Sequence, residues 1–385
     1  AARGTVVVDP IRATYFSVRG LVDALRCGDG FRIGRTLCFV GTTLAPLAGP
    51  ASRLAKPMLA RAERIASEVR DARLDGMIRV SKAQVAFVAG DFASMLELCD
   101  AGARLLAEDG RGVRWDWDVA QMGAMRALEE LGRADEIQRR LPALIDQALS
   151  LEDLYAEVTF RLYDGFWRIA RGDIEQARAT ARWVVERWGG AGFQLQHLYA
   201  LRIEACCDVY ERAQRTGWNR LEEAWPAIRR SGLLAHLMLR SDALALRARL
   251  ALAAGGDVER EVEGAARSFD KMQRPDAIAS ALMLRAALSS RRGDRAGAVA
   301  RLARAEASYA KAWMALIEAE GRGPVHLFGN SMGGAVATTV AATRPDLVRT
   351  LTLVSPALPD FVPGRWRSQV VTLATPGLGP LLAKQ

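Results

Sequence analysis

The chain has 385 residues, half of them apolar, and a formal net charge of +9. This is enough core material for more than one domain, and the dominance of Ala, Leu and Arg favours helices over sheets. No apolar run is long enough to span a membrane, and the basic residues, 48 Arg and 5 Lys, form no compact run, so we place them on solvated helix faces rather than on a nucleic-acid surface.

The cysteines indicate the cellular compartment, and the first residues indicate whether the chain is part of a larger protein. None of the five cysteines has Cys-x-x-Cys spacing or a nearby histidine, so we expect no metal site, and no motif calls for a cofactor. Buried reduced thiols are typical of a cytoplasmic protein. The chain starts at Ala1 without Met or a signal peptide, and we expect it to be a piece of a larger protein.

A recurring hinge organises most of the chain. In residues 172–178 a Gly ends one helix, an Asp caps the next, and an apolar residue opens it. From Gly90 on, such hinges lie roughly 40 residues apart, the period of a helix-turn-helix solenoid. The related hinges contain Gly28-Asp29, Gly90-Asp91, Gly132 with Asp135, Thr216-Gly217-Trp218-Asn219, Gly256-Asp257 and Gly293-Asp294.

In chain order, an extended segment is expected at 5–9. Helices follow at 11–26, 31–44 and 51–73, the last with Pro57 as a kink. Helical hairpins then pair 74–89 with 92–108, 115–131 with 135–149, 154–170 with 174–188, 193–213 with 218–229, 234–254 with 258–269, and 275–291 with 296–312.

Each of these helices has one apolar stripe to bury, as Leu154, Val158 and Leu162 illustrate. Stacked hairpins bury a continuous core, so the sequence predicts a mainly α protein: an α-solenoid of about seven hairpins over residues 1–312, forming a right-handed superhelix with a concave face. We interpret His197, His236 and the tryptophans at 167, 183, 188, 218 and 225 as packed core residues rather than ligands.

Residues 1–312 resemble tetratricopeptide-type repeats. More specifically, they resemble the C-terminal repeat region of bacterial signalling proteins in which a serine/threonine kinase and a P-loop ATPase domain come first. The resemblance is carried by Ala13-Thr14-Tyr15-Phe16, by residues 192–201 and by Trp225-Pro226-Ala227. It implies an interaction or regulatory scaffold with a protein or peptide partner on the concave face. The kinase and ATPase motifs themselves do not occur in this chain.

After about Ala312 the pattern changes. A short apolar strand at 325–328 leads into Gly329-Asn330-Ser331-Met332-Gly333, followed by a small-residue helix at 335–343 and a strand at 347–354. Gly-x-Ser-x-Gly between strand and helix is the pattern of a nucleophile elbow, where the positions two before and two after the Ser must be very small.

Residues 313–385 therefore resemble a truncated α/β-hydrolase of the esterase and lipase type, a β-α-β fragment of that fold. The resemblance implies Ser331 as nucleophile, the Met332 amide as an oxyanion donor, and Gly329 and Gly333 as the elbow glycines. The run at 357–361 would begin a cap domain.

The remaining catalytic residues are missing. The family order is Ser, acid, His, yet His197, His236 and His326 all precede Ser331. Without a base, a Ser hydroxyl is a poor nucleophile. We therefore favour a scaffold fused near Trp313 to an incomplete hydrolase segment. A serine hydrolase with a helical accessory domain is the alternative, and a nucleic-acid binder is disfavoured because no DNA-binding helix-turn-helix module is present.

Overall fold

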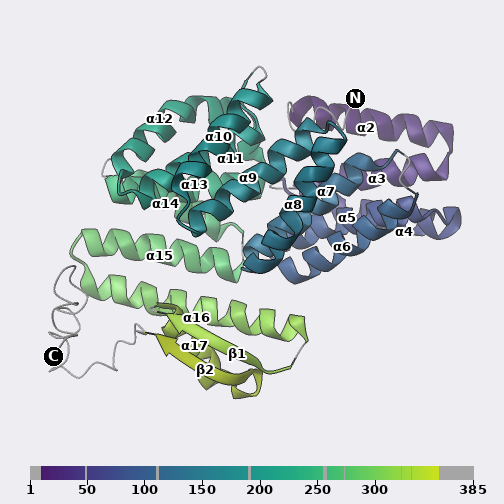
Figure 1. Cartoon of the computed structure of the whole chain (residues 1–385). Coiled ribbons are helices and arrows are strands. Elements are labelled where there is room, and N and C mark those ends of the chain that lie inside the picture. The colour runs from purple at the N-terminus through teal and green to yellow at the C-terminus, as the bar shows by residue number, and fades with distance from the viewer. Residues whose placement is uncertain are drawn as a thin grey trace. The chain divides into compact units, whose positions relative to one another are not determined.

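The computed structural model describes residues 10–47, 50–109, 112–189, 192–254, 258–272, 274–321, 323–330 and 332–354. Within them the chain is mainly helical and carries a single two-stranded sheet near its C-terminal end (Figure 1). This confirms the mainly α class with a small hydrolase-like β-α-β fragment. The expected extended segment at 5–9 and the cap at 357–361 fall outside these residues. The chain divides into two compact units, 1–268 (unit 1) and 269–385 (unit 2).

Unit 1 begins with α2 (Pro10–Cys27) and continues as helical hairpins, with short 3₁₀ helices η1 (Pro50–Leu54) and η2 (Leu233–Ala235). Its described residues contain no strand. The hairpins pair α3 (Gly30–Leu44) with α4 (Ala55–Val69), α5 (Ala72–Ala89) with α6 (Phe92–Asp109), α7 (Arg114–Glu130) with α8 (Ala134–Ser150), α9 (Leu154–Ala170) with α10 (Ile174–Trp188), α11 (Leu195–Tyr210) with α12 (Gln214–Arg230), and α13 (Leu237–Ala254) with α14 (Val258–Asp270), which ends at the unit boundary.

The hinge prediction holds for Gly172 but not for capping by the Asp173 side chain, which accepts from Arg168 instead, and it fails at Gly217. Gly172 adopts a φ of +81° between α9 and α10, as a helix-ending glycine does. Gly217 instead lies inside α12, and the turn before that helix contains Arg212 with a φ of +61°. A Cβ on Gly217 would stand 3.1 Å from Leu250 Cδ2 and 3.2 Å from Asp208 Cβ, so this glycine serves close helix packing.

The helix expected at 51–73 is shorter in the structure, where α4 covers Ala55–Val69. Helix α4 ends at Val69, because Arg70 turns into the left-handed region with a φ of +54°. Asp71 then caps α5, and its carboxylate accepts a hydrogen bond from the Arg73 amide at 2.9 Å. Pro57 lies in the first turn of α4, where a missing amide leaves no intrahelical bond unmade.

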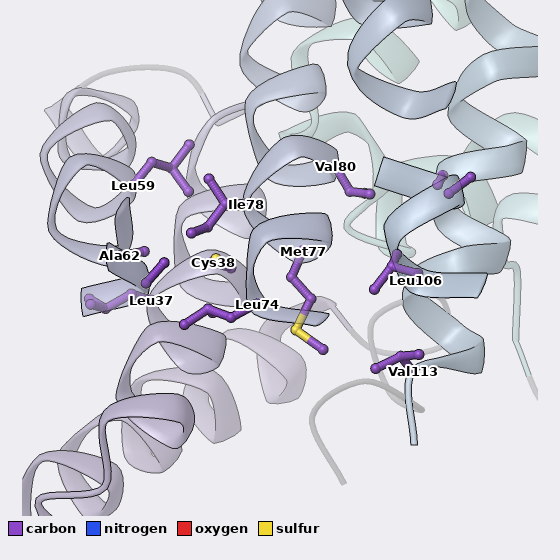
Figure 2. Close-up of a cluster of buried hydrophobic side chains, with 13 residues drawn as sticks. Leu37, Cys38, Leu59, Ala62, Leu74, Met77, Ile78, Val80, Leu106 and Val113 are labelled. Atoms are coloured by element: carbon purple, nitrogen blue, oxygen red, sulfur yellow. The ribbon is translucent and has the colours of Figure 1, made fainter. Parts of the chain in front are cut away.

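The core of unit 1 runs from hairpin to hairpin. One cluster brings Leu37 of α3, Leu59 of α4, Leu74 and Met77 of α5, and Leu106 of α6 into contact, and all five are nearly inaccessible to solvent (Figure 2). Such contacts explain why hairpins with one apolar stripe each are stable only when stacked. Burying side chains of this size contributes about 1.5–3 kcal/mol each.

Unit 2 joins one helical hairpin to the sheet. Its elements are α15 (Pro275–Arg291), α16 (Arg295–Glu320), β1 (Val325–Asn330), α17 (Met332–Thr343), η3 (Pro345–Leu347) and β2 (Val348–Val354). The strands pair in parallel, with Val325 opposite Val348 and Asn330 opposite Val354, as expected. Helix α17 packs on the strands and on α16, through a cluster that includes Ile317, Leu327 and Val340.

Helix α16 runs without a break through Ala312 and Trp313, where the sequence pattern changes. Its first half pairs with α15, and its second half supports α17 through side chains such as Ala310 and Ile317. One helix therefore serves both the last hairpin and the hydrolase-like segment. This continuity explains why the compact unit that contains the strands begins before α15.

Candidate functional site

Unit 1 closes on itself at two segments far apart in the sequence. The loop after α3 meets the corner between η2 and α13. There the Leu237 amide donates a hydrogen bond to the Pro46 carbonyl at 2.8 Å, and Leu47 and His236 form an isolated antiparallel bridge. The intervening hairpins therefore wrap around a common interior.

That interior holds a cavity of about 340 Å³. Its walls come mainly from the first helix of each successive hairpin, α3, α5, α7, α9, α11 and α13. Most lining side chains are apolar, among them Phe39, Val80, Val119, Met122 and Leu239. A largely apolar hollow with a few polar groups is the usual form of a small-molecule or peptide-anchor site.

A charge network lies at the wall of the cavity. Arg126 of α7 approaches Asp242 of α13, with 3.4 Å between Nη2 and Oδ2, and also pairs with Glu129 and Glu130. Arg202 of α11 donates to the same Asp242 oxygen at 3.2 Å. Burial alone lowers the pKa of Arg126, but Asp242, Glu129 and Glu130 outweigh burial and raise it, so Arg126 stays charged. Three helices are thus joined at one carboxylate.

His236 lines the same cavity beside this network. Burial lowers the pKa of its imidazole to about 4, against the smaller opposing effect of Asp242, and Arg126 lowers it further. His236 is therefore neutral at pH 7, with one ring nitrogen able to donate and the other to accept. Among the described residues no hydrogen-bond partner exists for its Nδ1 or for Nε of Arg126.

Aromatic rings complete the lining. Trp115 of α7 stacks on Tyr155 of α9, with ring centroids 4.8 Å apart and planes 17° apart. Burial raises the pKa of Tyr155 and of Tyr163, so both hydroxyls remain protonated at neutral pH. The Tyr163 hydroxyl donates to the Met122 carbonyl at 3.3 Å. Rigid aromatic walls of this kind suit a flat or apolar ligand.

Sequence reasoning missed this site. The sequence pattern predicts His236 as a packed residue on a helix, whereas it lies just before α13 and lines the cavity. His197 does act structurally, since its Nδ1 accepts a hydrogen bond from the Gln194 amide at 3.1 Å and caps α11. A charged Arg126 amid an apolar helix pattern was an available clue. Its partner Asp242, however, is set by curvature that no local pattern contains.

The second candidate site is the strand-to-helix turn of unit 2. Gly329 is the buried next-to-last residue of β1, and a Cβ there would come within 2.6 Å of both the Gly333 carbonyl oxygen and Gly334 Cα. A Cβ on Gly333 would meet nothing within 4 Å. Of the two elbow glycines, only Gly329 has no room for a side chain, and the tightness of this turn is what a nucleophile elbow requires.

The candidate nucleophile Ser331 lies outside the described residues, and Met332 opens α17. His326 is exposed on β1, and its Nδ1 lies 2.7 Å from the Thr350 hydroxyl oxygen on β2. The neighbouring Leu327 packs toward α17. Because strand side chains alternate between faces, His326 is on the face of the sheet that points away from α17.

The cavity lies in unit 1 and the strand-to-helix turn lies in unit 2. Three further features of the described residues concern metal binding, membrane spans and the cysteines. Among the described residues, no group of His, Cys, Asp or Glu side chains has the arrangement of a metal site. In the same part of the chain, no helix combines the length and apolarity needed to cross a membrane. Cys27 is exposed and Cys206 partly so, which corrects the expectation that all the thiols are buried.

Comparison with known proteins bears on unit 2. A profile of the alpha/beta hydrolase fold matches residues 289–373. A stretch of 44 residues is 52% identical to "Lipase LipV" from Mycobacterium tuberculosis, and it covers 11% of this chain and 17% of the lipase. The chain thus spans about a sixth of the relative it matches. No solved structure matches the chain. The profile begins in the last turn of α15, so the likeness includes α16 and starts earlier than Trp313.

Proposed function

We propose that this chain is a helical-repeat interaction scaffold, a part of a larger bacterial signalling protein, and that its hydrolase-like segment is catalytically incomplete. The partner would be a protein or peptide bound on the concave side of unit 1. The observation that supports this most strongly is the common hollow, to which six successive first helices each contribute side chains. A partner bound in this hollow would contact all six hairpins of unit 1.

Trp115 provides the test of partner binding. It lines the hollow and is held by stacking on Tyr155, so it is a rigid aromatic surface of the kind that dominates binding energy at interfaces. Peptides selected from a random display library on the full chain would be labelled, and their affinity measured by fluorescence anisotropy. We expect Trp115→Ala to weaken binding by at least about tenfold.

The matched control is Trp313→Ala. Trp313 lies on α16 of unit 2 and is 48% exposed, so its loss should leave the affinity within about twofold. If the selected peptides bind Trp115→Ala as tightly as the original chain, the concave side of unit 1 is not the partner surface.

The serine hydrolase alternative rests on the crowding at Gly329 and on the likeness of residues 289–373 to the alpha/beta hydrolase fold. Both support descent from an elbow, but activity also needs a base within hydrogen-bond reach of the Ser331 hydroxyl. His326 is on the opposite face of the sheet. The scaffold proposal therefore accounts for more of the molecule, since unit 1 contains most of the chain.

A further inference from the structure

The cavity of unit 1 has the size of a small-molecule site. At about 340 Å³ it falls within the range of roughly 300–1,000 Å³ that is typical of such sites. Its lining is mostly apolar, with side chains such as Phe39, Val119 and Leu239 that offer water no hydrogen bonds, and it also includes polar groups such as Ser81 and Gln84. Such a hollow is stabilised when an apolar molecule fills it.

Two polar atoms at this cavity lack partners. Nε of Arg126 and Nδ1 of His236 have no hydrogen bond within the described part of the chain. The Arg126 side chain is only 10% exposed, so water outside the molecule cannot satisfy its Nε freely. A buried donor without an acceptor is costly, and native proteins rarely leave one unless something else binds it.

The charges around the cavity select against an ionic ligand. Arg126 is already balanced by Glu129, Glu130 and Asp242, and Asp242 also binds Arg202. An anion in the cavity would face the carboxylates of Asp116 and Asp242, and a cation would face the guanidinium groups of Arg35 and Arg126. His236 adds no charge, because its pKa is far below 7. A ligand without net charge avoids both penalties.

We propose that this cavity binds one small, uncharged, mostly apolar organic molecule that carries a carbonyl-type acceptor. Both Arg126 Nε and His236 Nδ1 are covered in this structure, so side-chain adjustment on binding brings the acceptor of the ligand to the Arg126 Nε–H and leaves His236 Nδ1 available for a second polar contact. The lining includes Pro46 and Leu47 on one side of the closure and His236 on the other. A bound molecule therefore contacts both of the segments that close unit 1 and stabilises the closed arrangement of its hairpins.

This goes beyond partner binding, and either proposal can fail without the other. The partner proposal is tested at Trp115 and the small-molecule proposal at Val119 and Ala235, different lining residues of the same hollow. The small-molecule site is tested with a defined probe rather than with a selected peptide, so the two results are independent.

The probe is 6-propionyl-2-dimethylaminonaphthalene, an uncharged fluorophore with an apolar double ring and a ketone acceptor. Its emission shifts to shorter wavelength in apolar surroundings. Titration of the full chain should give saturable, blue-shifted fluorescence with one molecule bound per chain. The analogue with a propyl group in place of the propionyl group, 6-propyl-2-dimethylaminonaphthalene, should bind at least about fivefold more weakly, because it keeps the apolar chain but cannot accept from Arg126.

Two substitutions block the cavity and one does not. Val119→Trp fills the interior from α7, and Ala235→Trp narrows the hollow from an exposed lining position where folding tolerates a large side chain. Val209→Trp, on α11 at a site 42% exposed and outside the lining, is the matched control. We expect each blocking variant to weaken probe binding by at least about tenfold and the control to stay within about twofold.

Circular dichroism separates blocking from unfolding. If Val119→Trp does not fold, Ala235→Trp decides the question by itself. Absence of saturable binding to the original chain would overturn the proposal. So would binding that both blocking variants retain, which would place the probe elsewhere. Equal affinity for the ketone and its ketone-free analogue would refute the assigned hydrogen bond and with it the ligand class.

Discussion

Arg126 of α7 and Asp242 of α13 face each other across the interior of unit 1, with 3.4 Å between Nη2 and Oδ2. The same carboxylate binds Arg202 of α11 at 3.2 Å. These contacts lie at the cavity wall, and the same cavity is lined by Leu47 and His236, whose bridge closes unit 1. The polar network and the closure thus stabilise the same arrangement of hairpins.

Loss of the Asp242 carboxylate should destabilise unit 1. Asp242→Ala removes the shared partner of Arg126 and Arg202, but Arg126 keeps Glu129 and Glu130. The cost should therefore fall below that of a fully broken buried pair, at about 2 kcal/mol. Urea unfolding followed by tryptophan fluorescence measures it.

The control for this prediction is Asp23→Ala. Asp23 pairs with Arg19 on α2, where both side chains are more than half exposed. Exposed pairs contribute little, so the loss should be no more than about 0.5 kcal/mol. Equal destabilisation by the two variants would show that the Asp242 network does not stabilise the closed arrangement of the hairpins in unit 1.

His236 should make stability depend on pH. Its pKa is about 4 in the folded chain, and an unfolded histidine has a pKa of about 6.5. Between these values the unfolded chain binds more protons, so stability is full above pH 6.5 and is lost as the pH falls toward 4. The charged groups that act on the imidazole are Asp242, which opposes this shift, and Arg126, which adds to it. The expected loss between pH 7 and pH 5 is about 2 kcal/mol.

The measurement compares the original chain with His236→Phe, because another group titrates in the same range. Burial raises the pKa of Asp118 to about 6, despite its ion pair with Arg114, so Asp118 acts in the opposite direction. The difference between the two chains isolates His236. Parallel stability curves from pH 7 to pH 5 would mean that His236 is not a buried neutral imidazole.

The turn of unit 2 should distinguish its two glycines. Gly329→Ala places a Cβ 2.6 Å from backbone atoms that cannot move aside, so β1 must shift. Gly333→Ala meets nothing and should be neutral or slightly favourable in a helix. Hydrogen exchange of the β1 and β2 amides should accelerate by at least about tenfold in the first variant, a local loss above 1.4 kcal/mol. Equal protection in both would contradict the tight turn.

Local pattern accounts for most of the fold but little of the cavity. The Gly and Asp hinge at 172 and 173 marks a hairpin because Gly172 adopts a left-handed φ and Asp173 stands at the N-cap position of α10, although its carboxylate binds Arg168 rather than an α10 amide. Arg70 and Arg212 end helices in the left-handed region, which residues of this type rarely enter, so no sequence signal announces them. The meeting of Leu47 with His236 depends on curvature summed over several hairpins. A helical period in one segment carries no information about that sum.

The last prediction concerns catalysis. We expect no esterase turnover above background on activated esters, and no change on Ser331→Ala, because the Ser331 hydroxyl needs a base within hydrogen-bond reach. His326 is engaged with Thr350 at 2.7 Å on the face of the sheet away from α17. The other histidines belong to unit 1, where His197 caps a helix and His236 lines the cavity. Labelling with a fluorophosphonate probe is the decisive measurement. Stoichiometric labelling at Ser331 that disappears on substitution of one histidine would reveal a working dyad and would replace the scaffold proposal with the serine hydrolase.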